Sequence, residues 1–103
     1  MSWPVKEAGP FEEISGEVVL DYHTLGYHPG VVFRAHEFHF TNLGAGTASV
    51  YVWGAGGDWS AHGSPVTNNS VVQLEGASPR FRFVFAGTGG AGKVSVRSTA
   101  RGF

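Results

Sequence analysis

Histidine is the residue type in this sequence that most invites a metal site. The five histidines are His23, His28, His36, His39 and His62. On a regular strand side chains alternate between the two faces, so Glu37 and His39 share one face while His36 points to the other. His23 is the remaining candidate to join them. Since a protein metal site typically needs three or four converging ligands, we expect no metal centre and no cofactor.

Nucleophilic and acid–base catalysis would need side chains that converge on one point. The chain has no cysteine, and its serines lack the Gly-x-Ser-x-Gly elbow of serine hydrolases. The acidic residues within the body of the chain are scattered along it: Asp21, Glu37, Asp58 and Glu75. Glycine runs at 54–57 and 87–92 precede neither a helix pattern nor Gly-Lys-Ser/Thr, so we interpret them as turns and not as phosphate-binding loops. We therefore predict that the protein is not an enzyme.

Three aromatic residues, Tyr51, Trp53 and Trp59, form a candidate binding platform. Flat aromatic rings suit the apolar side of a sugar ring, which would make the chain a carbohydrate-binding module with a glycan partner. Aromatic residues are also typical of protein cores and of subunit contacts. The pattern leaves these alternatives open, and we treat the three residues as interface candidates.

Basic residues gather in the second half of the chain, at Arg80, Arg82, Lys93 and Arg97. Acidic residues predominate before residue 53, although the net charge is only −1. A nucleic-acid surface usually combines stacking aromatics with a clear positive balance, so we do not expect nucleic acid as a partner. The uneven charge favours ion pairs between neighbouring strands or contacts between copies of the chain.

Segment 31–53 organises the chain as two predicted strands around a turn. Residues 31–41 and 47–53 are rich in aromatic and β-branched residues, whereas 42–46 contain Asn and Gly. We predict a β-hairpin, because Asn and Gly tolerate the positive φ of tight turns. The two sides of 31–41 change character midway, which predicts a bend or bulge there.

Segment 80–99 carries the clearest alternation of apolar and polar residues. Phe81, Phe83 and Phe85 share one face of the strand 80–86, and we predict that they lie in the core. A glycine turn precedes the strand 93–99. We therefore predict a second hairpin, with the four basic residues together on its outer face.

Residues 1–15 show neither strand nor helix periodicity and predict an extended N-terminal arm, followed by a single domain at 16–103. The arm contains the apolar residues Trp3, Val5 and Phe11. An ordered terminus needs an anchor, which here is either the chain's own sheet or a neighbouring subunit. The sequence does not choose between these two positions.

Composition favours strands over helices throughout. Among 103 residues there are 16 glycines and 14% aromatic residues, and glycine is costly inside a helix whereas aromatics pack well across strands. Segment 54–69 is glycine-rich and without a period, so we expect a long loop. Six to eight strands with turns every ten residues or so predict an all-β, antiparallel, jelly-roll-like sandwich without a helix, and a small barrel is the alternative.

The first residues lack the basic region and apolar run of a secretory signal, and no apolar run approaches the ~20 residues of a membrane helix. We therefore expect a chain without a signal peptide, made in the cytoplasm of its host, and no membrane partner.

Several motifs follow one another between residues 38 and 98, at 38–44 (Phe-His-Phe-Thr-Asn-Leu-Gly), 50–53, 71–74, 81–83 and 87–90. Together they resemble small β-sandwich modules of tailed-bacteriophage virion proteins. This family includes head decoration, head fibre and tail-associated proteins. The resemblance implies a non-enzymatic, repeated structural role in the virion, with copies of the chain and other virion proteins as partners.

Three functions are compatible with the sequence. The first is a virion structural protein that assembles through its arm and a sheet face, the second is a carbohydrate-binding module, and the third is a cupin-like metal-binding protein, although the His-x-His with a later Glu of cupins is missing. The candidate interface residues are Trp3, Val5, Phe11, Tyr51, Trp53, Trp59, Arg80, Arg82 and Arg97.

Overall fold

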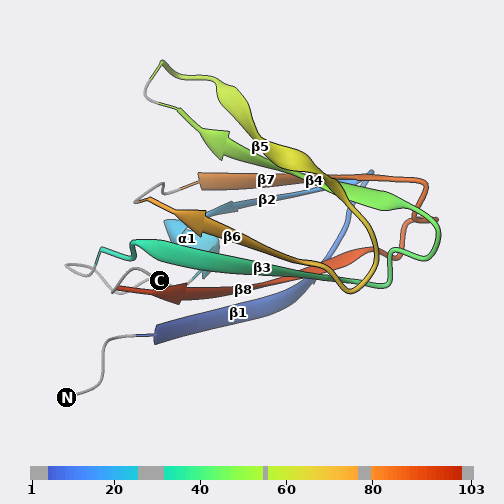
Figure 1. Ribbon diagram of the computed structural model, residues 1–103, viewed down its shortest axis with the longest axis horizontal. Helices are drawn as coiled ribbons and strands as arrows, with labels where there is room; N and C mark the ends of the chain where they lie inside the picture. The colour runs from blue at the N-terminus through green and yellow to red at the C-terminus, as the bar shows by residue number, and fades with distance from the viewer. Residues whose placement is uncertain (1–4, 26–31, 55, 77–79, 101–103) are drawn as a thin grey trace.

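Two antiparallel sheets stack face to face in the computed structural model, which describes residues 5–25, 32–54, 56–76 and 80–100 (Figure 1). The elements are β1 (Val5–Glu12), β2 (Glu17–Asp21), α1 (Tyr22–Leu25), β3 (Ala35–Thr41), β4 (Thr47–Trp53), β5 (Trp59–Val66), β6 (Val71–Glu75), β7 (Arg80–Ala86) and β8 (Lys93–Thr99). Sheet I has the order β1-β8-β3-β6, and sheet II has the order β2-β7-β4-β5. These eight strands confirm the predicted all-β antiparallel sandwich.

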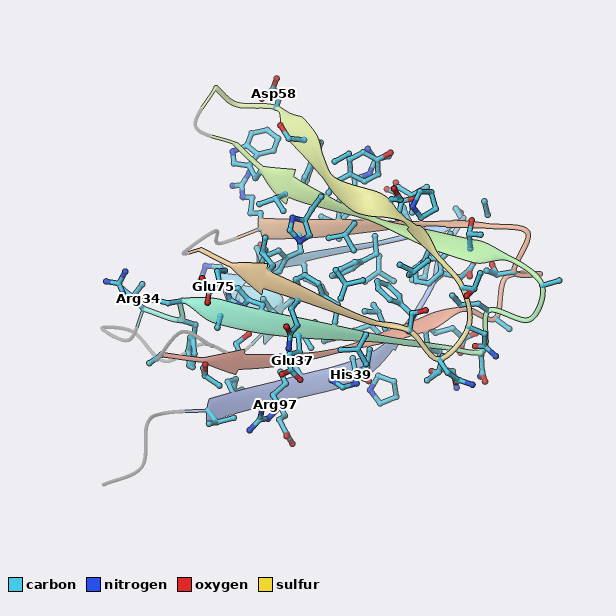
Figure 2. The ribbon with its side chains drawn as sticks, in the orientation of Figure 1. Arg34, Glu37, His39, Asp58, Glu75 and Arg97 are labelled. Atoms are coloured by element: carbon cyan, nitrogen blue, oxygen red, sulfur yellow. The ribbon has the colours of Figure 1, made fainter. Side chains whose placement is uncertain are left out.

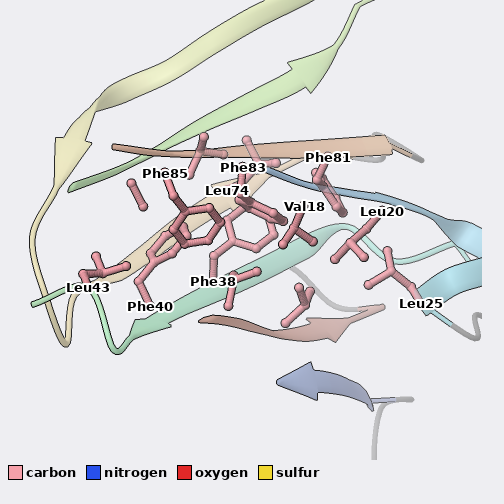
Figure 3. Packing of buried hydrophobic residues seen from close by; sticks show 14 residues of the cluster. Val18, Leu20, Leu25, Phe38, Phe40, Leu43, Leu74, Phe81, Phe83 and Phe85 are labelled. Carbon is pink, nitrogen blue, oxygen red and sulfur yellow. The ribbon is translucent and has the colours of Figure 1, made fainter. Parts of the chain in front are cut away.

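Phenylalanines from the middle of each sheet fill the space between the layers. Phe38 and Phe40 of β3 meet Phe81, Phe83 and Phe85 of β7, and all five are at most 6% exposed (Figure 3). The rings of Phe38 and Phe83 pack edge to face, with centroids 4.9 Å apart. Burying a phenylalanine stabilises the fold by roughly 1.5–3 kcal/mol, so these rings hold the sheets together. The predicted core position of the β7 phenylalanines is confirmed.

Neither predicted hairpin forms. β3 pairs with β6 and β8 in sheet I, whereas β4 pairs with β5 and β7 in sheet II. β7 and β8 are separated between the sheets in the same way. The prediction was wrong because consecutive strands that each carry an apolar face can bury those faces from opposite sides of one core as readily as side by side.

A close backbone approach marks the place where the chain passes from sheet I to sheet II. The N–H of Gly46 donates to the carbonyl of Leu43 over 2.9 Å and closes the turn after β3. A Cβ on Gly46 would collide with the carbonyl of Ala86 and the backbone of Gly87. Glycine at position 46 therefore lets the turn after β3 pack against the end of β7.

The expected loop at 54–69 contains a strand instead. β5 pairs with β4 at the edge of sheet II, and its register shifts between the pairs Ala48–Val66 and Val50–His62. Gly63, with φ of 75°, and Pro65 lie within this irregular part. An edge strand pairs on one side only, so it tolerates glycine, proline and polar residues that hide its period.

Most of the expected arm belongs to the sandwich. Residues 5–12 form β1, which pairs with β8 in sheet I, with a register shift between Ala8 and Phe11. Of the two positions left open for this segment, the chain's own sheet is the one that residues 5–12 occupy. The buried carboxylate of Glu13 then accepts hydrogen bonds from the Thr88 hydroxyl at 2.6 Å and the Gly92 N–H at 2.8 Å, which ties the segment down.

Two local expectations need correction. β3 keeps a regular register with β6 and β8, so it has no bend or bulge. Its mixed pattern arises because His36 occupies a core position on the same face as Phe38. The chain also contains one helical turn, α1, where no helix was expected. Its start is capped by Asp21, whose Oδ1 accepts from the backbone N–H groups of His23 and Thr24 over 2.9 and 3.0 Å.

Within the described part of the chain, no helix has the length and apolar character needed to cross a membrane.

Candidate interaction face

Five of the candidate interface residues share the outer face of sheet II. The face-defining residues, which we call the aromatic–arginine face, are Tyr51, Trp53, Trp59, Arg80 and Arg82. They come from three neighbouring strands, β4, β5 and β7, and in β4 and β7 the alternate side chains point into the core. The alternation of a strand with one buried face therefore gathers residues that lie up to about thirty positions apart in the sequence.

The register of sheet II brings cations and rings together in pairs. Arg82 lies opposite Tyr51, and Trp53 lies opposite Trp59. The guanidinium carbon of Arg82 is 5.9 Å from the centre of the Tyr51 ring, and that of Arg80 is 5.3 Å from the Trp53 ring. At such distances the cation is attracted to the face of the ring by about 0.5–1 kcal/mol at an exposed site.

An ion pair fixes the position of one arginine. The Nε and Nη2 of Arg82 donate to Oε2 of Glu17 on β2 over 3.0 and 2.8 Å. The two side chains are 36% and 41% exposed, so solvent screening limits the pair to under about 1 kcal/mol. Its main effect is to orient the guanidinium over Tyr51. The pair joins Glu17 from the acidic first half of the chain to Arg82 from the basic second half. It is an ion pair between neighbouring strands, one of the two arrangements that the uneven charge distribution favoured.

The two tryptophans stand edge to face. Their ring centres are 5.1 Å apart and their planes differ by 75°. Side chains of Tyr51, Trp53 and Trp59 are all half-buried, so the rings are held and yet reachable. A sugar platform works best with open ring faces, and here the face of Trp53 already carries Arg80. The arrangement instead has the composition of a protein contact, in which Trp, Tyr and Arg supply most of the binding energy.

The other basic candidates lie elsewhere. Lys93 and Arg97 belong to β8, on the outer side of sheet I, where Nε of Arg97 is 3.5 Å from Oε1 of Glu7. The predicted single basic cluster is therefore wrong, because β7 and β8 are in different sheets. Arg97 does not join the aromatic–arginine face.

The arm candidates divide in a similar way. Val5 is 48% exposed at the start of β1, and Phe11 packs against the core. Trp3 lies outside the described residues. Val5 and Phe11 therefore do not extend the aromatic–arginine face.

The candidate metal ligands do not converge. Glu37 and His39 lie on the outer side of sheet I with Nε2 of His39 3.4 Å from Oε2 of Glu37, in a cleft of about 360 Å³ that Glu7 and Arg97 also line (Figure 2). His23 is on α1. Among the described residues, no three His, Cys, Asp or Glu side chains are grouped closely enough for a metal ion.

A buried histidine was missed by the sequence reasoning. His36 is fully buried, with Nδ1 2.7 Å from the Ser98 hydroxyl and Nε2 3.2 Å from the Gly76 carbonyl. A carbonyl only accepts, so Nε2 carries the proton and the Ser98 hydroxyl donates to Nδ1. Burial lowers the pKa of His36 to about 4, although the Gly76 hydrogen bond opposes this. The sequence contained one signal for this burial. His36, Phe38 and Phe40 are spaced two residues apart, which places them on the same face of a strand.

An apolar groove of about 590 Å³ runs between the edge strands β1 and β2. Phe11, Val18 and Leu20 line it, together with Ile14, which is 78% exposed. This groove is on the edge of the sandwich and not on the aromatic–arginine face.

Comparison with solved structures finds this fold in other proteins. The SPBc2 prophage-derived protein YomS superposes with a TM-score of 0.69 at 10% identity, over 96% of each chain. The Tobacco streak virus coat protein gives a TM-score of 0.48 at 12% identity, over 94% of this chain and 84% of that one. No protein-family model and no curated protein matches the sequence. The chain thus has the fold of a prophage-derived protein.

Proposed function

We propose that the chain is a non-enzymatic structural protein of a bacteriophage particle, as a capsid decoration, head fibre or tail component. Its partners would be copies of itself and other virion proteins, and its location the virion. The observation that carries the proposal is the aromatic–arginine face. The half-buried Tyr51, Trp53, Trp59 and Arg82, together with the exposed Arg80, have the composition of an assembly contact.

Two further observations support this function. The fold is similar along almost its whole length to the prophage-derived protein YomS. The ring faces of Trp53 and Tyr51 are occupied by arginines of the same chain, an arrangement that suits a large protein surface better than a small ligand.

The test is incorporation into particles. Particles would be purified by density gradient from cells carrying the complete phage genome with an epitope-tagged copy of this gene, and the chain would be sought by mass spectrometry and immunogold labelling. We expect the wild-type chain in the particles and loss of most of it with Arg80→Glu. The matched control is Arg97→Glu, an equally exposed arginine on the other sheet, which should leave incorporation unchanged. Absence of the wild-type chain from the particles would refute the proposal.

Carbohydrate binding is the second candidate, and the adjacent aromatic rings of Tyr51, Trp53 and Trp59 favour it. A glycan array with the wild-type chain and with the triple alanine variant measures it directly. Binding that the triple variant loses would support this candidate over the first. An array without signal removes it.

A further inference from the structure

The aromatic–arginine face consists of two parallel columns. Arg80 and Arg82 form a cationic column on β7, and Trp53 and Tyr51 form an aromatic column beside it on β4. Within one copy each arginine already lies over its neighbouring ring. A second copy related by a two-fold axis along the line between the columns would place its arginine column opposite the aromatic column of the first.

The charge of the face suits such a pairing. The acids Glu17 and Asp21 stand on β2, directly beside the arginine column, with Asp21 opposite Arg80 in register. Together with these two acids, the outer side of sheet II at this place carries as many negative as positive side chains. A contact between identical patches must not repel itself, and a neutral patch that contains both an attractive cation and its ring partner meets this condition.

The edges of the sandwich are poor places for assembly. On β2 the free edge is closed at one end by Ile14, which exchanges two backbone hydrogen bonds with Glu17. At its other end the Thr24 hydroxyl accepts from the Asp21 N–H and donates to the Asp21 carbonyl. On β1 the register breaks beside Pro10, which has no N–H to donate. Strands with such interruptions do not add a further strand easily.

The opposite edges are blocked as well. β5 contains Gly63 and Pro65 in its irregular part. On β6 the Gln73 carbonyl already accepts a hydrogen bond of 2.9 Å from Nε2 of His62, which reaches over from β5. Strand addition is thus hindered at these edges, which favours contacts made through side chains, such as those of the aromatic–arginine face.

We propose that the aromatic–arginine face binds the same face of a second copy about a two-fold axis that runs along the strands between β4 and β7. Each arginine–ring pair of one copy then packs against the equivalent pair of the other, with the arginine column of each copy across from the aromatic column of its partner. This proposal rests on the proposed function, since it names the first partner of the face. The contact makes a closed dimer, which would be the unit added to a particle.

Sedimentation equilibrium of the purified full chain over a wide concentration range tests the dimer. We expect a monomer–dimer equilibrium whose dissociation constant rises about 30-fold or more with Trp53→Ala, as for an interface hot spot. Arg80→Glu should act in the same direction, and Arg97→Glu on sheet I should leave the constant unchanged. Circular dichroism of each variant checks that it is folded.

Cross-linking provides a second measurement that needs no destabilising substitution. The chain has no cysteine, so a single one can be introduced on either sheet. Ser49 on the outer side of sheet II and Ser95 on that of sheet I are both half-buried serines. With a short bismaleimide, Ser49→Cys should give covalent dimers and Ser95→Cys should not.

A chain that stays monomeric at millimolar concentration overturns the proposal. So does a dimer that is insensitive to Trp53→Ala, or one that cross-links through position 95 and not through position 49. These results are separable from the proposed function. A monomer found in purified particles refutes the dimer alone, whereas a dimer absent from particles refutes the virion role alone.

Discussion

The outer faces of the two sheets use their charged side chains differently. On sheet I Arg97 pairs with Glu7, and these side chains are 45% and 75% exposed. The imidazole of His39 lies 3.4 Å from the carboxylate of Glu37 on the same side (Figure 2). On sheet II the arginines lie over aromatic rings, and one of them is oriented by Glu17. The same sandwich thus has one outer face of solvent-exposed polar groups and one on which arginines lie over aromatic rings.

In a small sandwich the outer side chains of the sheets can differ more freely than the inner ones. The strand pattern has to satisfy the core, which fixes the inner side chains of both sheets in the same way. Only the outer positions are free to differ, and there aromatic residues on sheet II have no packing role that the core requires. Under the proposed function, these aromatic residues would also contact a partner.

The largest loss of stability is expected from a substitution in the core, on which the outer faces of both sheets depend. Phe83 is fully buried between Phe38 and Phe40, so Phe83→Ala leaves a cavity between the sheets. We expect the free energy of unfolding to fall by about 3–5 kcal/mol. Denaturant unfolding followed by fluorescence measures it, with Val71→Ala, at a 52% exposed position, as the control. A loss below about 1 kcal/mol would show that the sheets are held together elsewhere.

Acid is the next strongest perturbation, and it acts through the inner side of sheet I. His36 has its pKa lowered to about 4 in the folded chain, whereas an unfolded histidine has about 6.5. As the pH falls from 6.5 towards 4, His36 becomes protonated in the unfolded chain but stays neutral in the folded chain. The free energy of unfolding therefore decreases over this range, and His36 causes no further decrease at lower pH. The expected loss is about 3 kcal/mol in total.

Unfolding by denaturant at a series of pH values, with the wild type and His36→Gln, measures this loss. Carboxylates titrate in the same range, but they are common to both proteins, so the difference between them isolates His36. Glutamine can still hydrogen-bond to Ser98 and cannot take up the proton. Equal pH dependence in the two proteins would mean that His36 is not held neutral by its burial.

The sequence predicted which side chains are buried better than it predicted which strands pair with each other. Periodicity of two placed Phe81, Phe83 and Phe85 in the core because burial acts on each strand locally. It did not predict that β3 and β4 separate into different sheets, since the pairing of a strand depends on which distant strand covers its edge. The same limitation produced the false basic cluster of Arg82 with Arg97.

In the candidate site, too, the face on which a side chain lies could be predicted, but its contacts with other strands could not. Tyr51 and Trp53 could be placed on one face from their spacing alone. Their contact with Arg80 and Arg82 required the register of β4 against β7, which the sequence does not encode locally. Strand β5, which supplies Trp59, was hidden by Gly63 and Pro65, because an edge strand needs little apolar periodicity.

A smaller effect distinguishes the two outer faces directly. Trp59→Ala removes the edge-to-face contact with Trp53 and should destabilise the monomer by about 1–2 kcal/mol. His39→Ala at the matching side of sheet I, where the imidazole is 45% exposed, should change stability by less than about 0.5 kcal/mol. Thermal unfolding of dilute, monomeric protein measures both. Equal effects would mean that the aromatic residues of sheet II do not stabilise their own sheet.

The smallest expected difference is between the two ion pairs that cross neighbouring strands. Both join an acid of an edge strand to an arginine of a central strand, but Glu17 makes two short contacts with an arginine held over a ring, whereas Glu7 is 3.5 Å from Arg97. Double-mutant cycles with Glu→Gln and Arg→Gln should give a coupling of about 0.5–1 kcal/mol for Glu17–Arg82 and near zero for Glu7–Arg97. Raising the salt concentration should reduce the first coupling, because both side chains remain partly exposed. If the two couplings prove equal, then the ring beneath Arg82 does not orient it, and the distinction between a solvent face and a contact face would rest on the tryptophans alone.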